Sequence, residues 1–234
     1  MAWVEAAKKQ AALASAKHVE SGQIIGLGSG STAVHFIREV GRKLKTGKLS
    51  DILAVPTSYQ ASIDAVREGI ELTTLDEYPE LDLAVDGADQ LDIKLNVIKG
   101  GGAALLREKI IAASAKYYII IADERKLVGT LGEGQTIPIE VLPFAIEPVT
   151  RRLTKMGGIT KLRVGSGKLG PVVTDNGHFV VDTGFGEISD PVVLDLELKK
   201  IPGVLETGLF LGYTDIAYIG TENGVKIIEK KVST

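Results

Sequence analysis

Three short segments of the 234-residue sequence place glycine beside side chains that can bind an anion or move a proton. Residues 28–32 read Gly-Ser-Gly-Ser-Thr, residues 86–89 read Asp-Gly-Ala-Asp, and residues 99–102 read Lys-Gly-Gly-Gly. Glycine lets the backbone approach a ligand closely because it carries no side chain. Hydroxyl and ammonium groups stabilise negatively charged oxygens, and carboxylates accept and return protons. These residue types favour metal-free proton transfer on a small anionic substrate.

The segment 28–32 is suited to holding a phosphate. It lies between an apolar run and a helical pattern, so the N–H groups of the helix start point at an anion bound there. The hydroxyls of Ser31 and Thr32 add donors. Gly26 and Gly28 fit the dinucleotide pattern G-x-G-x-x-G, but Ser31 occupies the third glycine position and no P-loop motif occurs, which disfavours a nucleotide. Taken alone, the loop is equally consistent with an ordinary strand-to-helix turn.

Asp86 and Asp89 come directly after an apolar strand pattern. Three residues apart on one turn, their carboxylates face a common space, where they can hold sugar hydroxyls or share protons. The alternative is a turn in which Asp only satisfies the local backbone geometry.

Lys99 precedes Gly100, Gly101 and Gly102, and three consecutive glycines destabilise regular structure unless a close backbone approach requires them. Lys99 offers positive charge to a developing oxyanion, and Glu108 on the following helix offers a base. Taken alone, Glu108 is also consistent with a solvent-exposed helix residue.

No metal site is expected from the sequence. His18, His35 and His178 are widely scattered, and no two of them lie at metal-ligand spacing.

Alternating strand and helix patterns connect these segments. Apolar or small residues at helical spacing predict a first helix over residues 4–19. The predicted strands cover residues 23–27, 51–55, 71–74, 81–85 and 117–122, and the next helices cover residues 34–40, 58–68 and 103–115. This order predicts an α/β fold with a doubly wound, mostly parallel, Rossmann-like sheet, whose strand ends bring the three segments beside helix N-termini.

From residue 131 the pattern changes, with Pro138, Pro143 and Pro148 close together. We predict a second, smaller α+β domain over residues 131–205, and an α/β domain formed by residues 1–130 and 206–234. The smaller domain is expected to hold helices over residues 149–155 and 192–200, extended segments at 161–164 and 171–174, and a turn at 175–177 followed by a strand at 178–182. A final hairpin, with strands at 215–219 and 225–228, is expected to rejoin the first sheet.

Composition and charge exclude several classes of protein. The absence of cysteine removes disulfides and thiolate sites and is consistent with a reducing compartment, so a cytoplasmic location is expected. Lys and Arg number 27 against 30 Asp and Glu, and this net charge of -3 argues against a nucleic-acid partner. No membrane contact is expected, because no uncharged apolar run approaches the roughly 18 residues of a span and the N-terminus lacks a signal-peptide pattern.

The order and spacing of these motifs closely resemble ribose-5-phosphate isomerase type A. The resemblance rests on residues 28–32, 86–89, 99–102, 107–109 and 122–126, with further likeness at 173–177, 201–204 and 219–221. It therefore extends over nearly the whole chain. Two departures are visible: Ser29 stands where the family commonly has Thr, and Gln90 follows Asp89 where an acid is usual, which removes a negative charge beside the site.

The resemblance implies interconversion of ribose 5-phosphate and ribulose 5-phosphate in the non-oxidative pentose phosphate pathway, without metal or organic cofactor. Glu108 would move the proton between C2 and C1 through a cis-enediol(ate), Lys99 and the glycine amides would stabilise the oxygen, and Asp86 and Asp89 would assist ring opening and hold hydroxyls. The residues implied to bind phosphate or substrate oxygens are Ser29, Gly30, Ser31, Thr32, Gly100, Gly101, Gly102, Lys126 and Lys8.

The resemblance also implies a homodimer or homotetramer in which the smaller domain supplies subunit contacts. Two alternatives remain at this point. One is a sugar-phosphate sensor of the same fold that binds without turnover. The other is a different enzyme of the wider superfamily, an amino-sugar-phosphate deaminase or an acyl-CoA transferase.

Overall fold

The computed structural model describes residues 2–167 and 169–230, whose strands form three sheets. The largest sheet has the strand order β14-β13-β7-β4-β1-β2-β3. Its strands are β1 (Ile24–Leu27), β2 (Leu53–Pro56), β3 (Glu71–Leu72), β4 (Leu83–Gly87), β7 (Tyr118–Asp123), β13 (Ile216–Thr221) and β14 (Gly224–Glu229). All neighbours in it pair in parallel except β13 and β14, which form an antiparallel hairpin at one edge. The predicted parallel sheet and its returning hairpin are confirmed.

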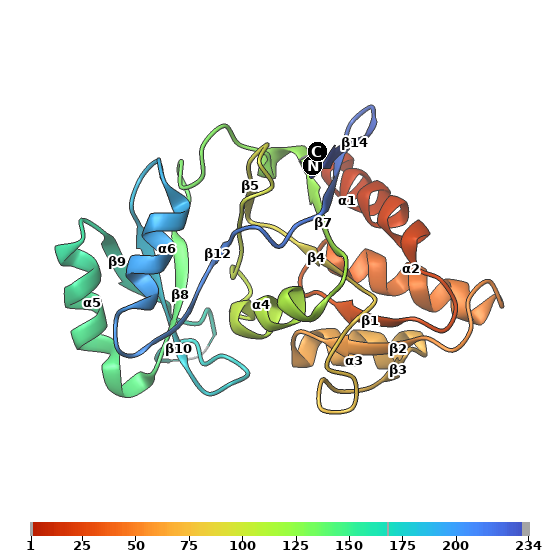
Figure 1. The fold of residues 1–234 in the computed structure, drawn as a ribbon, viewed down its shortest axis with the longest axis horizontal. Helices are drawn as coiled ribbons and strands as arrows, with labels where there is room; N and C mark the ends of the chain where they lie inside the picture. Colours follow the sequence, from red (N-terminus) through yellow and green to blue (C-terminus); the bar gives the residue numbers. More distant parts are fainter. Residues whose placement is uncertain (1, 168, 231–234) are drawn as a thin grey trace.

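Helices cover both faces of this sheet (Figure 1). They are α1 (Ala2–Ser15), extended by the 3-10 turn Ala16–His18, α2 (Ala33–Lys45), α3 (Tyr59–Glu68) and α4 (Leu105–Ser114). Ile119 and Ile121 of β7 face the core under α1, α2 and α3, whereas Ile120 and Ala122 face the core under α4. This alternation follows from the strand's period of two, and it explains why β7 is a continuous apolar run.

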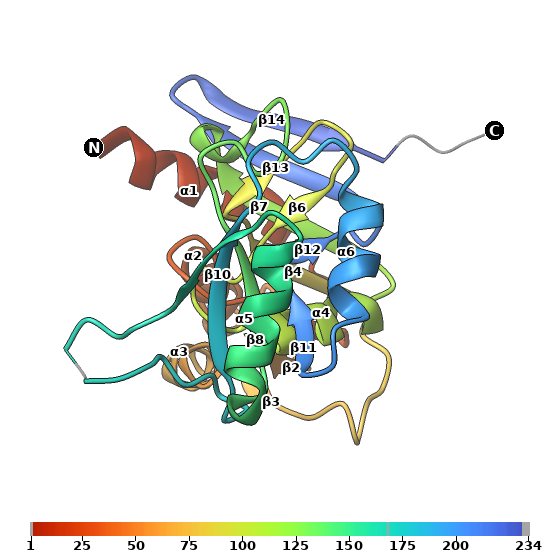
Figure 2. The same cartoon turned by 90° about the vertical axis from the view of Figure 1, so that its left-hand side faces the viewer.

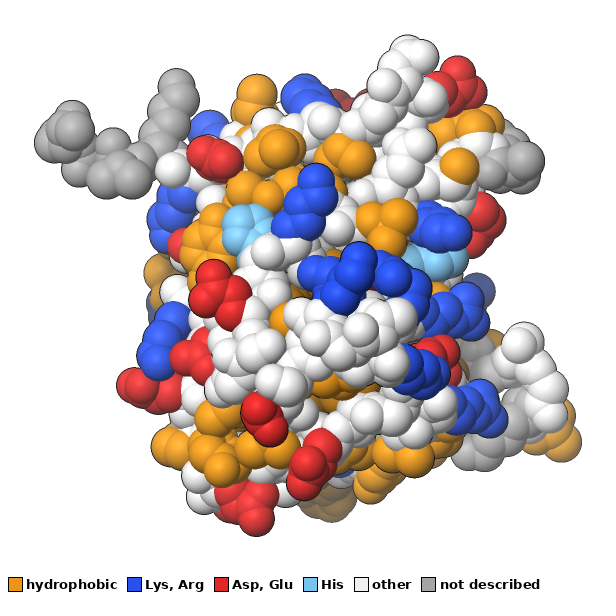
Figure 3. Space-filling model, turned by 90° about the vertical axis from the view of Figure 1, so that its right-hand side faces the viewer, with side chains coloured by type: hydrophobic (Ala, Val, Ile, Leu, Met, Phe, Trp, Pro, Cys, Tyr) orange, Lys and Arg blue, Asp and Glu red, His pale blue; other side chains and the backbone are white. Residues whose placement is uncertain are grey.

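The helix α2 illustrates how the outer layer is built. Phe36, Ile37 and Val40 are buried at helical spacing, while Arg42 and Lys43 lie in its last turn, where positive charge complements the carbonyl end of the helix. Figure 3 views the molecule from the side of these helices and shows Lys and Arg side chains gathered across the middle of that face.

A second, antiparallel sheet has the order β11-β8-β10-β9 and its own apolar core (Figure 2). It comprises β8 (Ile137–Val141), β9 (Ile159–Leu162), β10 (Phe179–Gly184) and β11 (Val204–Thr207), with helices α5 (Ile146–Lys155) and α6 (Pro191–Lys199) packed beside it. The predicted start of α6 is confirmed, because the Asp190 side chain accepts hydrogen bonds from the N–H groups of Val192 and Val193 ahead of Pro191 at the first turn.

The strand β8 was missed by the sequence analysis because it contains Pro138. Proline removes a backbone donor and is unusual inside a sheet. Here the regular β8–β11 ladder stops at Ile139, and Pro138 pairs with Asp182 of β10 while its carbonyl accepts a hydrogen bond from the Gly208 N–H. Neither contact needs the missing N–H of the proline. The 171–174 segment is also not a regular strand; it makes only isolated bridges, Val164 to Pro171 and Val173 to Phe179.

A small third sheet joins the two larger ones. Its strands, β5 (Gln90–Leu91), β6 (Val97–Ile98) and β12 (Leu209–Phe210), are antiparallel and only two residues long. The sequence analysis did not find them, because a strand of two residues shows no periodicity. Lys99 follows β6 directly, and its N–H donates to the carbonyl of Gly208 beside β12, 2.9 Å away.

We expect Gly220→Ala to destabilise the fold. A Cβ atom at Gly220 of β13 would lie 2.0 Å from the Ala7 carbonyl oxygen of α1, so the helix must move off the sheet. Overpacking of this kind costs about 1–3 kcal/mol, and it should lower the denaturant midpoint measured by circular dichroism. The matched control is Gly129→Ala, where an added Cβ meets nothing within 4 Å and the midpoint should not change. Equal midpoints for the two variants would contradict this packing.

Candidate active site

A cavity of about 290 Å³ lies where the carboxyl ends of β1, β4 and β7 meet the glycine segment 99–102. This volume is close to the lower end of small-molecule sites, roughly 300 Å³. The predicted residues that line it are Lys8, Ser29, Gly30, Ser31, Thr32, Asp89, Lys99, Gly100, Gly101, Gly102, Glu108 and Lys126. The structure therefore brings together residues that are far apart in the sequence, including Lys8 from α1.

Lys99 lines the cavity, and its side chain is almost completely buried. Its side chain is 3% exposed, and its Nζ donates to the carbonyl oxygen of Gly87 at 2.6 Å. The same Nζ lies 3.1 Å from Asp86 Oδ2 and 3.4 Å from Glu108 Oε1. Two carboxylates thus share one buried cation.

Asp86 occupies a different position from the one expected. It belongs to β4 rather than to the following turn, is 1% exposed, and is not among the residues that line the cavity. Its Oδ1 accepts hydrogen bonds from the N–H groups of Ser29 and Gly87. Gly28 makes room for it, since a Cβ atom there would lie 2.1 Å from Asp86 Oδ1. Asp86 therefore supports Lys99 from behind the cavity wall.

Glu108 lies in the first turn of α4 and is 5% exposed, so it is not a solvated helix residue. Its neighbours on the helix have partners elsewhere: Arg107 bonds to Asn176, and Lys109 pairs with Glu206. Among the described residues nothing hydrogen-bonds to Glu108 Oε2, which is buried. A carboxylate oxygen without a partner at the wall of a cavity is free to take a proton from a ligand.

Burial raises the pKa of Glu108 to about 8, and the nearby charge of Asp86 acts in the same direction while Lys99 opposes it. For Lys99, burial alone would lower the pKa, but Asp86 and Glu108 outweigh it, so the pKa is raised and the lysine stays charged. A base whose pKa lies near neutral pH gains and loses a proton with little driving force either way. The cluster thus combines a fixed cation with a carboxyl group that exchanges its proton.

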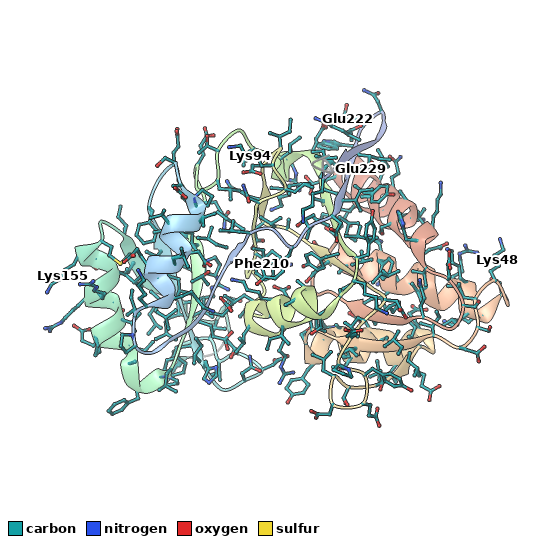
Figure 4. The ribbon with its side chains drawn as sticks, viewed as in Figure 1. Lys48, Lys94, Lys155, Phe210, Glu222 and Glu229 are labelled. Atoms are coloured by element: carbon teal, nitrogen blue, oxygen red, sulfur yellow. The ribbon has the colours of Figure 1, made fainter. Side chains whose placement is uncertain are left out.

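Phe210 of β12 supplies an aromatic wall beside this cluster. The Lys99 Nζ lies 5.5 Å from the centroid of its ring, and the Lys109 Nζ lies 4.9 Å from the same centroid. Figure 4 shows Phe210 in the middle of the molecule, next to α4. The negative face of the ring stabilises ammonium groups that burial has removed from water.

The glycine segment forms a tight, partly left-handed loop. Gly100 has φ +103°, and Ala103 has φ +60°, a rare conformation for a residue with a side chain. The Ala103 N–H donates to the Gly100 carbonyl, which closes the turn. The N–H of Gly101 donates to Asp89 Oδ2 at 2.7 Å, so the two predicted segments contact each other directly.

A second group of residues that line the cavity is rich in hydrogen-bond donors. Lys8 Nζ donates to Ser31 Oγ at 3.1 Å, and Thr32 precedes α2 without using its side chain to cap the helix. Lys126 also lines the cavity. Ser29 differs from these residues, because its hydroxyl bonds to Thr57 and Ser58 and its N–H to Asp86. Ser29 therefore shapes the loop and leaves its neighbours to contact an anion.

Four lining residues were not singled out as site residues: Gly87, Ala88, Asp123 and Arg125. Asp123 could have been predicted as a site residue, since it is the last residue of β7 and lies at the carboxyl edge of the sheet. Its carboxylate pairs with Arg125, whose Nε lies 2.6 Å from Asp123 Oδ1. Gln90, the departure from the family pattern, bonds to the backbone of Gly132 and Glu133, so its amide holds the loop that precedes β8.

Two further findings concern possible partners. Within the described ranges, no cluster of three or more His, Asp or Glu side chains is arranged to hold a metal ion. Among the same residues, every helix is too short or too polar to cross a membrane.

Comparison with known proteins gives a consistent family. The family model described as ribose 5-phosphate isomerase A (phosphoriboisomerase A) matches residues 53–224. A protein named ribose-5-phosphate isomerase A from Pyrococcus abyssi is 47% identical over 227 residues, which cover 97% of this chain and 99% of that protein. A protein of the same name from Methanosarcina acetivorans is 49% identical over 225 residues, covering 96% and 94%.

Solved structures agree with these sequences. A D-ribose-5-phosphate isomerase in complex with phospho-erythronic acid superposes with a TM-score of 0.95 at 47% identity, covering 97% of this chain and 99% of that one. A ribose 5-phosphate isomerase from Plasmodium falciparum superposes with a TM-score of 0.93 at 37% identity, covering 97% and 100%.

The raised pKa of Glu108 should make the stability of the protein depend on pH. Between the unfolded value, 4.5, and about 8, the folded protein holds a proton that the unfolded chain has released, so stability falls as pH rises. Glu108→Gln removes this titration. We expect the melting temperature of the variant, relative to the unmodified chain, to increase steadily from about pH 5 to about pH 8. Glu197→Gln, at an exposed position whose carboxyl pKa is lowered, should show no such trend in that window. A pH-independent difference for Glu108→Gln would contradict the assignment.

Proposed function

The chain belongs to the ribose 5-phosphate isomerase A family, and on that premise we propose that its cavity interconverts ribose 5-phosphate and ribulose 5-phosphate. The protein is an enzyme, an aldose-ketose isomerase, and this interconversion is a step of the non-oxidative pentose phosphate pathway. The observation that carries the proposal is the contact of Lys99 Nζ with both Asp86 and Glu108 at a cavity whose lining also includes hydroxyl and ammonium groups suited to an anion.

Glu108 is proposed as the base. With the sugar in its open form, the Glu108 carboxylate takes the proton from C2, the C–H electron pair forms the C1=C2 double bond, and the carbonyl π pair moves onto O1. The proton on O2 then passes to O1, which becomes the C1 hydroxyl. The O2 electron pair forms the C2 carbonyl, and the C1=C2 electron pair takes the proton back from Glu108 at C1. One carboxyl group that faces both carbons suffices for both transfers.

Lys99 and the glycine amides are proposed to stabilise the enediolate oxygen. The Lys99 ammonium keeps its charge and is held in place before the reaction begins, so no reorganisation is needed when negative charge develops. Asp89, which lines the cavity, is proposed to assist ring opening and to accept hydrogen bonds from sugar hydroxyls. Asp86, behind the wall, acts by holding Lys99.

The phosphate is proposed to bind at the far end. Thr32 and Ser31 offer hydroxyls next to the start of α2, and Lys8 and Lys126 offer positive charge. This anchor fixes one end of the sugar so that its C1 and C2 atoms reach Glu108. The reaction as proposed requires no metal or organic cofactor.

We further propose that the protein works in the cytoplasm as a homodimer or homotetramer, with residues 131–205 as the smaller domain that supplies subunit contacts. Exposed apolar side chains on α6 of that segment support the contact, among them Val192, Val193 and Leu196. Light scattering of the purified chain distinguishes these assemblies from a monomer.

Replacement of Glu108 tests the mechanism. After chelator treatment, the unmodified chain should convert ribose 5-phosphate to the ketose and, in D2O, incorporate deuterium from solvent, as proton transfer through a base requires. We expect Glu108→Gln to lower kcat by roughly 10²–10⁴-fold, and Lys99→Met to lower kcat by about 10²-fold or more with a smaller change in KM.

The matched control is Glu147→Gln, an exposed carboxylate that should leave kcat unchanged. Three results would contradict the proposal: activity that the chelator abolishes and a metal restores, an undiminished Glu108→Gln variant, or binding of ribose 5-phosphate without turnover. The last result would indicate a sugar-phosphate sensor.

A further inference from the structure

A side chain from the second sheet contacts the glycine segment of the cavity. Arg163 follows β9 directly, and its guanidinium Nη1 donates to the carbonyl oxygens of Gly100 at 2.8 Å and Gly101 at 3.0 Å. These two carbonyls belong to the peptide groups that form the cavity wall beside Lys99. Arg163 itself does not line the cavity, and nothing in the reaction described above uses it.

The guanidinium is fixed in direction by a second contact. Its Nε donates to Asp182 Oδ2 at 2.9 Å and its Nη2 donates to Asp182 Oδ1, so the pair is bidentate. Both side chains are less than one-fifth exposed, at 17% and 19%. A planar fork held at two points leaves the Nη1 hydrogens pointing in one direction, toward the loop.

The geometry of the peptide bond determines where the N–H groups that follow these two carbonyls point. In a trans peptide the C=O of one residue and the N–H of the next point in opposite directions, and the described chain contains no cis peptide bond. When Arg163 holds the carbonyls of Gly100 and Gly101 toward the second sheet, the N–H groups of Gly101 and Gly102 must point away from it. The Gly101 N–H indeed donates to Asp89 Oδ2.

The Gly102 N–H is the remaining donor. Gly102 lines the cavity, and no hydrogen bond between described residues uses its N–H. A glycine loop cannot set this direction by itself, because residues without side chains sample many backbone conformations. An external contact is therefore needed to keep an amide donor aimed at a ligand.

We infer that Arg163 is a positioning residue of the isomerase: by holding the Gly100 and Gly101 carbonyls, it aims the Gly102 N–H at the enediolate oxygen. This inference rests on the proposed function. The positive charge of Arg163 also polarises the two peptide groups that it contacts, which strengthens their N–H groups as donors. Arg163 thus links the second sheet to the proposed reaction in the cavity at the edge of the first sheet.

A purely structural contact makes a different prediction from a positioning role. If Arg163 only joined the two sheets, its loss would lower thermal stability and leave the turnover of the folded enzyme intact. If it aims a donor that acts on the transition state, its loss lowers kcat more than it raises KM.

The experiment compares Arg163→Ala and Arg163→Lys with the unmodified enzyme. It measures kcat, KM, melting temperature and the affinity for phospho-erythronic acid, whose planar anionic carboxylate resembles the enediolate. Removing a direct oxyanion donor costs about 10²–10³-fold in kcat, so misaiming one donor should cost Arg163→Ala roughly 10-fold or more. The affinity for phospho-erythronic acid should fall by a similar factor, with KM within about threefold. Arg163→Lys keeps the positive charge but not the planar guanidinium. Its kcat and its affinity for phospho-erythronic acid should lie between those of Arg163→Ala and the unmodified enzyme.

The matched control is Arg151→Ala, which removes the same charge from α5. Among the described residues the Arg151 guanidinium hydrogen-bonds to Glu147 alone. This variant should leave all four quantities unchanged.

The inference is overturned if folded Arg163→Ala keeps kcat within about twofold, or if KM alone changes. If Arg163→Ala does not fold, Arg163→Lys decides by the same criteria. Failure of the proposed function would appear in the unmodified chain as an absence of turnover, whereas failure of this inference would appear only in the Arg163 variants.

Discussion

One buried ammonium group between two carboxylates is the interaction on which the site depends. A single positive charge cannot balance Asp86 and Glu108 together, and burial makes an uncompensated charge costly. The cluster is therefore most stable with one proton on a carboxyl group. Glu108 rather than Asp86 holds that proton, because the Glu108 carboxyl is farther from Lys99 and lacks the backbone donors that stabilise the Asp86 carboxylate. The electrostatics of burial thus produce a base that is ready to exchange a proton near neutral pH.

The surrounding fold keeps this cluster in place. Glycine at position 28 leaves space for the Asp86 carboxylate, and glycine at position 208 leaves space for the Lys99 carbonyl, 2.4 Å from where a Cβ atom would lie. The ring of Phe210 faces both Lys99 and Lys109. The parallel sheet brings the ends of β1, β4 and β7 together, so the residues proposed to bind phosphate and those proposed to transfer the proton line one cavity at the same edge of the sheet.

The sequence predicted site residues where those residues form a short motif of adjacent positions. Glycine runs next to Lys99 and before Ser31, and an aspartate after an apolar strand, predicted several of the residues that line the cavity. Lys8 and Lys126 were implied only by the family resemblance, and Asp123 and Arg125 were not predicted. The burial of Glu108 could not be predicted from its sequence neighbours, because Arg107 and Lys109 are typical of a solvent-exposed helix face. In the structure these two side chains bond to Asn176 and Glu206, which are far away in the sequence. Arg163 left no signal at all, since it contacts residues 62 and 63 positions away. The two-residue strands beside Lys99 likewise depend on tertiary pairing.

The central claim is that Glu108 carries an exchangeable proton while Lys99 stays charged, and neutron diffraction from deuterated crystals tests it most directly. Data are collected at pD values of about 6 and about 10, which lie on either side of the Glu108 pKa of about 8. The account predicts a deuteron on Glu108 in the first data set and none in the second, with three deuterons on Lys99 Nζ in both. A bare Glu108 carboxylate at the lower pD, or a neutral Lys99 at either, would contradict it.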